Sequence, residues 1–285
     1  MKILILGGTG LVGNALVEHL GSQHHVKAFG REIYENHSKL QSAITWADLV
    51  IQLSGANISK RWTKSYKQQI WDSRIETNKQ LVEVFNNLEK KPKLIFASAV
   101  GFYPESDCHH PLDESDLEHG DDFLALLANE WEKTAKKIHQ DVLIFRFGVV
   151  LSKQGGALKE MLPMYKLGLG GPINSGLQCF PWVYMKDLIR AFDFGIEHNL
   201  TGTFNLTSPQ IISQKQFGHA FAQSLKRPFF IKTFSFQLKL IFGQGADVLV
   251  KSLSVYPTKL LKAGFKFKFE KIDDAFLDIF HDKKR

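Results

Sequence analysis

Three glycines near the start of the chain have the spacing of a turn that holds an anionic ligand. Gly7, Gly10 and Gly13 follow the apolar run 2–6 and precede a stretch with apolar residues at helical spacing. In such a turn the first glycine permits a sharp exit from the strand, the second lets backbone amides approach a pyrophosphate, and the third lets the helix pack closely on the sheet. Unpaired amides at the helix N-terminus attract the anion. The segment therefore predicts a dinucleotide site rather than a tight turn without a ligand.

The end of the second apolar segment discriminates between the two nicotinamide cofactors. An acidic residue there binds the ribose 2′-hydroxyl of NAD, whereas an arginine accommodates the 2′-phosphate of NADP. Arg31 stands in this region, with Glu32 beside it and Lys27 shortly before it. The basic residues favour NADP over NAD. A plain surface role for Arg31 is the competing interpretation.

Alternating strand and helix patterns position this turn. Residues 2–6 are apolar at every position after Lys2, which is typical of a central parallel strand covered on both faces. Further strands are expected from Val26 to Ala28 and at 49–54, 93–98 and 142–151, with helices from Leu11 to Leu20 and at about 64–89, 121–139 and 156–167. This order predicts the α/β class: a Rossmann-type doubly wound parallel sheet with a small C-terminal α/β substrate lobe.

The texture of the sequence changes after Leu151, where shorter strand and helix signals begin and run to Phe280. No internal repeat or low-complexity linker separates the two parts. We therefore assign residues 1–165 to the Rossmann domain and residues 166–285 to the substrate lobe, with the last elements of the sheet interwoven with the lobe.

The distribution of charge, rather than the composition, argues against a nucleic-acid partner. Lysine and arginine total 36 against 29 acidic residues, a net charge of +7. The lysines are scattered, and Lys133, Lys136 and Lys137 lie within a turn or two of Glu130 and Glu132. This arrangement is typical of solvated surface charge, so a small-molecule ligand is the expected partner.

The two cysteines, Cys108 and Cys179, match no metal or redox spacing. We expect neither a disulfide nor a zinc site, and both residues are interpreted as bystanders. The apolar segment after Met1 is too short for a signal-peptide core, and no apolar run approaches membrane-spanning length. These features predict a soluble protein in a reducing compartment, most simply the cytoplasm, with no membrane partner. They leave the oligomeric state open.

Further stretches carry a resemblance to a known family. The three-by-three glycine spacing resembles that of extended short-chain dehydrogenase/reductases. The other matching segments are LSG at 53–55, RW at 61–62, SRIETNKQLV at 73–82, ASAVGFY at 97–103, RFGVVL at 146–151, LGLGGPINSG at 167–176, PWVYMKD at 181–187, GTFNLTSP at 202–209 and GFKF at 264–267. Together they resemble the atypical epimerase-like family, generally labelled nucleoside-diphosphate-sugar epimerases. Members carry a small C-terminal domain of unknown function, which here would begin at about residue 235.

The resemblance implies roles for individual residues. Cofactor contacts are implied at Gly7, Thr9, Gly10, Leu11, Val12, Gly13, Arg31, Ser54, Gly55 and Ala56. Ser98 falls at the catalytic Ser/Thr position of the superfamily. Gly168, Gly170 and Gly171 would form a lid over the substrate or simply end a helix, and Gln178 and Trp182 are the expected wall residues.

The usual proton-transfer pair of the superfamily, Tyr-x-x-x-Lys on a helix, is missing. The six tyrosines are Tyr34, Tyr66, Tyr103, Tyr165, Tyr184 and Tyr256, and none has a lysine four positions later. Leu124 and Ala128 stand roughly where the pair is expected. Either another group supplies the proton, or the protein binds the dinucleotide without this chemistry. The candidate groups are Tyr103, which we favour, and Asp187, Tyr184 or Glu130.

The adjacent His109 and His110 have no third ligand at metal spacing and are interpreted as exposed loop residues, so no metal is expected. The sequence thus predicts an NADP-binding epimerase or oxidoreductase that acts on a small polar substrate, nucleotide sugars among them. Ser98 and Tyr103 are its predicted catalytic residues. The alternative is a non-catalytic NADP-binding sensor or regulatory module.

Overall fold

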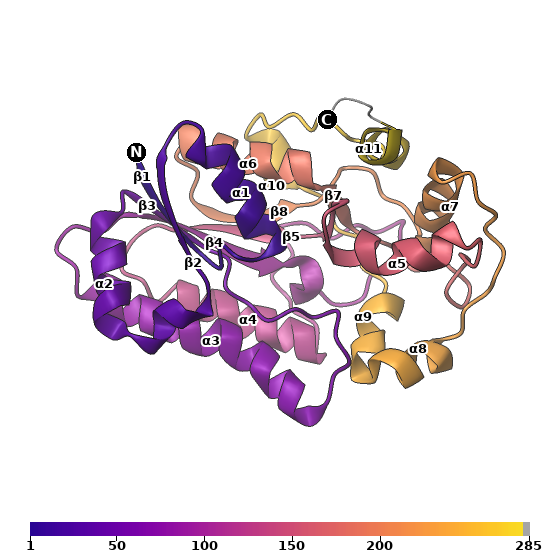
Figure 1. Ribbon diagram of the computed structural model, residues 1–285, viewed down its shortest axis with the longest axis horizontal. Helices are drawn as coiled ribbons and strands as arrows, with labels where there is room; N and C mark the ends of the chain where they lie inside the picture. Colours follow the sequence, from indigo (N-terminus) through magenta and orange to yellow (C-terminus); the bar gives the residue numbers. More distant parts are fainter. Residues whose placement is uncertain (282–285) are drawn as a thin grey trace.

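A six-stranded parallel sheet runs through the centre of the protein (Figure 1). Its strands are β1 (Lys2–Leu6), β2 (His25–Phe29), β3 (Leu49–Gln52), β4 (Lys93–Ala99), β5 (Leu143–Phe147) and β8 (Gly202–Leu206), in the order β2-β1-β3-β4-β5-β8. The structure is a computed structural model that describes residues 1–281. All strand pairs are parallel, which confirms the predicted α/β class.

Helices cover both faces of this sheet. On one face lie α1 (Leu11–Gly21) and α6 (Met185–Glu197), and on the other α2 (His37–Trp46), α3 (Lys64–Asn86) and α4 (Phe123–Ala135) (Figure 1). Side chains of β1 alternate between the layers: Ile3 and Ile5 join the cluster of Leu16, whereas Leu4 and Leu6 join that of the α2 side. Burial on both faces explains why β1 is apolar at successive positions.

The predicted strand at 142–151 is two strands that belong to different sheets. β5 stays in the central sheet, while β6 (Val149–Leu151) pairs with β7 (Trp182–Tyr184). Gly148 separates them, and a Cβ added there would lie 2.9 Å from Thr207 Cγ2 and 3.0 Å from the Pro181 carbonyl oxygen. The single-strand prediction is wrong because an uninterrupted apolar pattern does not reveal a change of partner strand.

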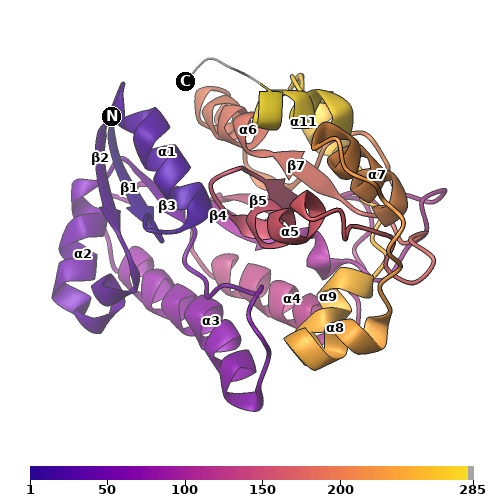
Figure 2. The same cartoon turned by 45° about the vertical axis from the view of Figure 1, so that its right-hand side comes forward.

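Helices dominate the described residues after β8. They are α7 (Gln214–Ser224), α8 (Ser235–Phe242), α9 (Asp247–Val250), α10 (Thr258–Lys262) and α11 (Ile272–His281). With α5 (Gly156–Lys166), most of them lie across the molecule from α2 (Figure 2). The predicted α/β lobe is thus helical after β8, with strands only in the β6–β7 pair. Because β8 and α6 complete the central layers, the sheet also draws on residues beyond 165; the exact domain boundary stays a prediction.

Short 3₁₀ turns complete the elements: η1 (Arg31–Glu35), η2 (Val100–Phe102) and η3 (Gln244–Ala246). Over residues 1–281, no helix has both the length and the apolar composition that crossing a bilayer requires.

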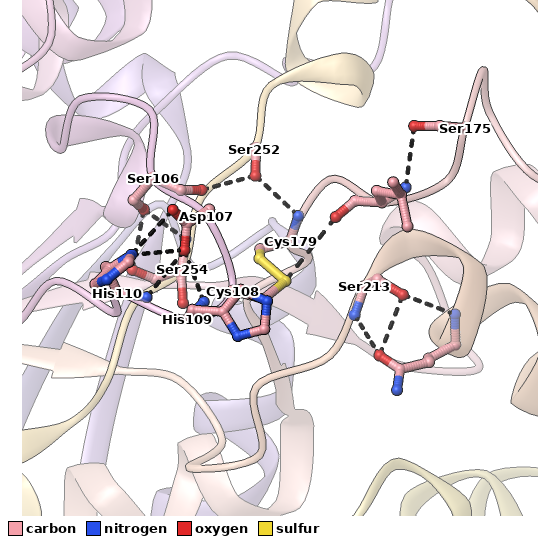
Figure 3. Close-up of a disulfide and its surroundings, with 12 residues drawn as sticks. Ser106, Asp107, Cys108, His109, His110, Ser175, Cys179, Ser213, Ser252 and Ser254 are labelled. Atoms are coloured by element: carbon pink, nitrogen blue, oxygen red, sulfur yellow. Dashed lines mark hydrogen bonds and ion pairs between the residues drawn. A yellow bond between two sulfur atoms is a disulfide. The ribbon is translucent and has the colours of Figure 1, made fainter.

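A disulfide joins Cys108, in the loop after η2, to Cys179, in the loop before β7 (Figure 3). Their Cα atoms are 5.6 Å apart although 71 positions separate them in sequence. The Ser252 hydroxyl accepts a hydrogen bond from the Cys179 backbone N–H and donates one to the Ser106 carbonyl oxygen. Three segments of the chain therefore meet here. The interpretation of both cysteines as bystanders is wrong, because their proximity depends on packing between distant loops.

Reduction of the Cys108–Cys179 bond is expected to lower the free energy of unfolding by about 2–4 kcal/mol, since a cross-link restricts the unfolded chain. Denaturant unfolding with and without a thiol reductant measures this difference. The Cys108→Ser variant is the control, and its transition should be the same in both conditions. A wild-type transition that does not move on reduction contradicts a stabilising disulfide.

Candidate dinucleotide-binding site

The strand order reverses beside β1, where open parallel sheets have the crevice that binds ligands. The chain leaves β1 for β2 on one side and reaches β3 on the other, and in open parallel sheets ligands bind at the carboxyl ends of strands where the order reverses. Gly7 follows β1 directly, and a Cβ added to it would lie 2.7 Å from the Leu53 carbonyl carbon. The glycine turn and the segment after β3 are therefore in contact at this switch point.

The three positions of the turn are occupied by glycine for different structural reasons. Gly7 has φ +84°, a conformation that favours glycine, and a Cβ on Gly13 would lie 2.3 Å from the Gly7 carbonyl oxygen. Packing within the chain thus requires both residues. Gly10 is exposed, and its added Cβ would approach only the Gly7 carbonyl oxygen, at 3.3 Å. Space above Gly10 is therefore left open to solvent.

The N-terminus of α1 opens onto this space. Gly10 is the N-cap and provides no side-chain hydrogen bond to the first turn. The leading N–H groups of a helix lack intrahelical acceptors and carry partial positive charge. Leu11, Val12 and Gly13 are the residues of that turn. An anion above Gly10 can accept hydrogen bonds there, as the sequence predicts for a pyrophosphate.

Arg31 lies beside the same turn. The N–H groups of Gly7 and Gly8 both donate to the Phe29 carbonyl oxygen at the end of β2, at 2.8 and 3.0 Å. Two residues later Arg31 begins η1 with an exposed side chain, and within residues 1–281 it has no ion-pair partner. Lys27 is directed elsewhere, since its ammonium lies 4.2 Å from the Trp46 ring centre.

The carboxylate of Glu32 is directed at the backbone of its own turn. It accepts a hydrogen bond from the Gly30 N–H at 2.8 Å. Backbone hydrogen bonds from Glu32 itself and from Gly30 lower the pKa of this carboxyl group. Of the two adjacent charged residues, Arg31 is the one whose charge has no partner in the described chain.

The segment after β3 has one exposed position among its three predicted cofactor contacts. Ser54 is buried, and its hydroxyl lies 3.0 Å from the Tyr34 hydroxyl, which donates to Gln52 Oε1. Burial raises the pKa of Tyr34 to about 12. Ala56 is buried as well, whereas Gly55 between them is exposed and lacks a side chain. A ligand can therefore approach this segment most directly at the Gly55 backbone.

Ser98 belongs to a buried network beneath the site. Its hydroxyl donates to Glu132 Oε1 of α4 at 2.8 Å. The two carboxylate oxygens of Glu132 also accept bonds from Arg146 Nε and Nη2, at 2.7 and 2.8 Å. Burial opposes the charge on Arg146, but the bonds to Glu132 outweigh it and raise the pKa of the guanidinium. In this arrangement the Ser98 hydroxyl supports the junction of β4, β5 and α4.

Tyr103 is also fully buried. Its hydroxyl lies within hydrogen-bond distance of the Asp113 carbonyl oxygen, at 2.9 Å, and of Asn205 Oδ1, at 3.0 Å. The Asn205 N–H in turn donates to Glu114 Oε1. Burial raises the pKa of Tyr103 to about 12, so the phenol stays protonated near neutral pH. Tyr103 thus connects the loop after η2 to β8.

Two of the other proton-donor candidates, Asp187 and Tyr184, hold the C-terminal segment in place. Buried Asp187 accepts hydrogen bonds from the N–H groups of Lys268 and Phe269 and pairs with Arg190. The Tyr184 hydroxyl donates to Asp278 Oδ2 at 2.5 Å. These contacts fix residues 268–278 against α6 and β7. At the positions of the missing pair, Leu124 and Ala128 lie in α4, where Ala128 is buried.

The residues predicted to line the substrate site differ in their exposure to solvent. Gln178 is half-buried, and its side chain donates to the Ile173 carbonyl oxygen at 3.4 Å. Trp182 has no exposed surface and packs in the main core, which opposes direct contact with a substrate. Gly171 approaches the 228–233 segment closely, because an added Cβ would lie 1.9 Å from the Ile231 carbonyl oxygen. Close packing accounts for this glycine without a lid.

The two adjacent histidines are exposed, as expected. His110 pairs with Asp107 at 3.0 Å, and the described residues contain no metal-binding cluster of His, Cys, Asp or Glu.

One basic residue at the site carries no predicted role. Arg74 of α3 reaches the segment after β3, where its Nη2 donates to the Ala56 carbonyl oxygen at 3.1 Å. A signal for it exists in the sequence. Ile70, Arg74, Thr77 and Leu81 follow one another at helical spacing, so Arg74 is a cation on the face of α3 that the fold buries.

The fold and the glycine turn define a Rossmann-type protein with the architecture of the short-chain dehydrogenases. The chain belongs to the NAD dependent epimerase/dehydratase family, whose profile it matches over residues 3–207. Residues 233–279 match a second profile, described as Domain of unknown function (DUF1731). The resemblance inferred from the sequence is thereby confirmed, and the first match ends directly after β8.

Similar proteins with epimerase names support this family assignment. The epimerase family protein SH2119 of Staphylococcus haemolyticus is 36% identical over 295 residues, covering 98% of each chain. The human epimerase family protein SDR39U1, solved with NADPH, superposes with a TM-score of 0.90 at 29% identity and covers 99% of this chain and 100% of that one. A nucleoside-diphosphate sugar epimerase from Corynebacterium glutamicum gives a TM-score of 0.77 at 25% identity, covering 98% of this chain and 58% of that chain.

The glycine turn allows a matched pair of substitutions. Gly10→Val is expected to abolish dinucleotide binding while the protein stays folded, because the added side chain enters the open space above α1. Gly13→Val should instead destabilise the fold, since its Cβ meets the Gly7 carbonyl oxygen. Calorimetric titration with NADPH and thermal unfolding separate the two effects. Wild-type affinity in Gly10→Val would place the ligand elsewhere.

Proposed function

We propose that this protein binds NADP(H) at the β1–β3 crevice and uses it on a small polar substrate, nucleotide sugars among them. The observation that carries the proposal is the open space above Gly10, at the end of α1 that lacks a side-chain cap. Beside it lies Arg31, which has no ion-pair partner in the described chain. The structure of the human relative SDR39U1, which was solved with NADPH, supports the choice of NADP(H) as the cofactor.

The proposed cofactor contacts divide along the crevice. The turn residues hold the pyrophosphate, Arg31 binds the 2′-phosphate, and the segment after β3 lines the nicotinamide side. The residues concerned are Gly7, Thr9, Gly10, Leu11, Val12, Gly13, Arg31, Ser54, Gly55 and Ala56. NADP is favoured over NAD because Glu32 bonds to its own backbone while Arg31 remains exposed.

A cytoplasmic location and the absence of a nucleic-acid partner remain predictions. Disulfides persist in oxidising compartments and are rare in cytosolic proteins. The Cys108–Cys179 bond therefore counts against the predicted location.

Arg31→Ala is expected to weaken NADP binding about ten- to hundredfold, because a charge-assisted contact to phosphate contributes about 1.5–3 kcal/mol. Binding of NAD, which lacks the 2′-phosphate, should barely change. Titration calorimetry with both cofactors measures the difference, and Lys27→Ala serves as a control that removes a neighbouring charge directed at Trp46. Equal loss for both cofactors in Arg31→Ala would reject the assignment.

Two alternatives remain for what the protein does with the bound cofactor: catalysis, or binding without turnover. In the enzyme, Ser98 orients the substrate oxygen and Tyr103 donates the proton, as the sequence predicts. Both hydroxyls would first have to exchange the buried partners they have here, Glu132 and Asn205. These internal hydrogen bonds are the observation that supports a second candidate, a cofactor-binding sensor without turnover. A metabolite screen with cofactor-loaded protein, monitored at the nicotinamide absorbance, distinguishes the two.

If Tyr103 donates the proton, Tyr103→Phe is expected to lower the turnover rate at least about tenfold, within the usual contribution of general acid catalysis. Affinity for NADPH should stay unchanged. Loss of the bond to Asn205 should also lower the free energy of unfolding by about 0.5–1.5 kcal/mol, which denaturant unfolding measures separately. Wild-type turnover in this variant would exclude Tyr103 as the donor.

A further inference from the structure

Arg74 is a partly buried cation without an anionic partner. Within residues 1–281 no carboxylate lies within ion-pair distance of its guanidinium. The two acids nearest to it in sequence on its own helix are engaged elsewhere: Glu76 pairs with Lys79, and Asp72 accepts a hydrogen bond from Gln68. By contrast, buried Arg146 is fully matched by Glu132.

The hydrogen bonds of Arg74 go only to neutral acceptors. Nη1 donates to the Ile70 carbonyl oxygen at 3.2 Å and lies 3.5 Å from the Ser73 hydroxyl, while Nη2 donates to the Ala56 carbonyl oxygen at 3.1 Å. A guanidinium has five N–H donors in a fixed plane, so these contacts leave donor capacity unused. The group is held rigidly but remains electrostatically unmatched.

The surroundings of the guanidinium fix where its remaining donors can act. One side packs at 5.1 Å from the ring centre of Trp131 in α4. On another side lies exposed Gly55, where an added Cβ would be 2.8 Å from Arg74 Cζ. The guanidinium thus borders the position of the segment after β3 that a ligand can approach. Burial also lowers the pKa of Arg74 to about 10, which still leaves it charged at neutral pH.

Burying a charge is unfavourable unless a partner compensates for it. A site at the carboxyl end of a parallel strand can receive that partner from a ligand. Resting on the proposed NADP site, we propose that Arg74 is a cofactor-binding residue whose guanidinium hydrogen-bonds the oxygen atoms of the nicotinamide half of NADP(H), its ribose hydroxyls or the adjoining phosphate.

This role gives the site a cation that α4 does not provide at the position of the missing lysine. The position at which the superfamily pair would place a lysine is Ala128, one turn before Trp131 on α4. Arg74 enters from α3 and lies against that same Trp131. The Arg74 guanidinium is charged at neutral pH and donates hydrogen bonds from a fixed plane. In this role it takes the place of the flexible lysine ammonium of the superfamily pair as the binding group. Proton transfer is not part of this role.

The test compares two ligands that share only the adenosine end with its 2′-phosphate. NADPH carries the nicotinamide half, whereas adenosine 2′,5′-bisphosphate lacks it. In Arg74→Gln, which keeps an amide donor for Ala56 but removes the charge, NADPH affinity should fall about tenfold or more while the bisphosphate binds as to wild type. Arg74→Lys, which keeps the charge, should lose less affinity for NADPH. Arg31→Ala, the matched control, should weaken both ligands.

Each outcome of the titrations decides the inference. Undiminished NADPH affinity in folded Arg74→Gln overturns it, and equal loss of both ligands shows that Arg74 merely shapes the fold. If Arg74→Gln fails to fold, as judged by thermal unfolding, the same comparison is made with Arg74→Lys, where a loss confined to NADPH is required. A wild-type protein that binds no NADPH overturns the proposed function itself, whereas binding retained in Arg74→Gln overturns only the role of Arg74.

Discussion

Parallel pairing on both sides of β1 is the constraint on which the rest of this structure depends. With β2 and β3 aligned in parallel to it, the carboxyl ends of all three strands lie at one edge. That edge brings together the glycine turn, the start of η1 and the segment after β3, although more than 40 positions separate Gly7 from Gly55. The crevice follows from strand order, and the absence of side chains at Gly10 and Gly55 keeps it accessible.

Buried hydrogen bonds use many of the polar groups that the superfamily chemistry would require. Ser98 bonds to the Glu132–Arg146 pair, and Tyr103 bonds to Asn205 of β8. A buried polar group must be satisfied, so such networks stabilise one arrangement of strands and helices. Leu124 and Ala128 are apolar and cannot transfer a proton. The groups available at the site, the glycine turn and Arg31, are therefore suited to binding a dinucleotide rather than to moving a proton.

Polar contacts also hold the C-terminal segment against the sheet. Asp187 binds the backbone at 268–269, Tyr184 bonds to Asp278, and the disulfide with its neighbouring Ser252 ties the loops near β7 to residues after α9. The second matched profile, residues 233–279, is thus docked by specific bonds at several points. Asp187, predicted as a candidate proton donor, is a docking residue for that segment.

The sequence by itself determined the α/β class, the family and the glycine turn, because these depend on local spacing: an apolar strand, glycines at fixed positions and a helix with one apolar face. It also showed that no tyrosine has a lysine four positions later. Only the tertiary structure decided which side chains meet. The change of sheet at Gly148, the pairing of Cys108 with Cys179, the burial of Trp182 and the unmatched charge of Arg74 all depend on contacts between residues far apart in the chain. Periodicity reports which face of an element is buried, whereas packing determines what that face touches.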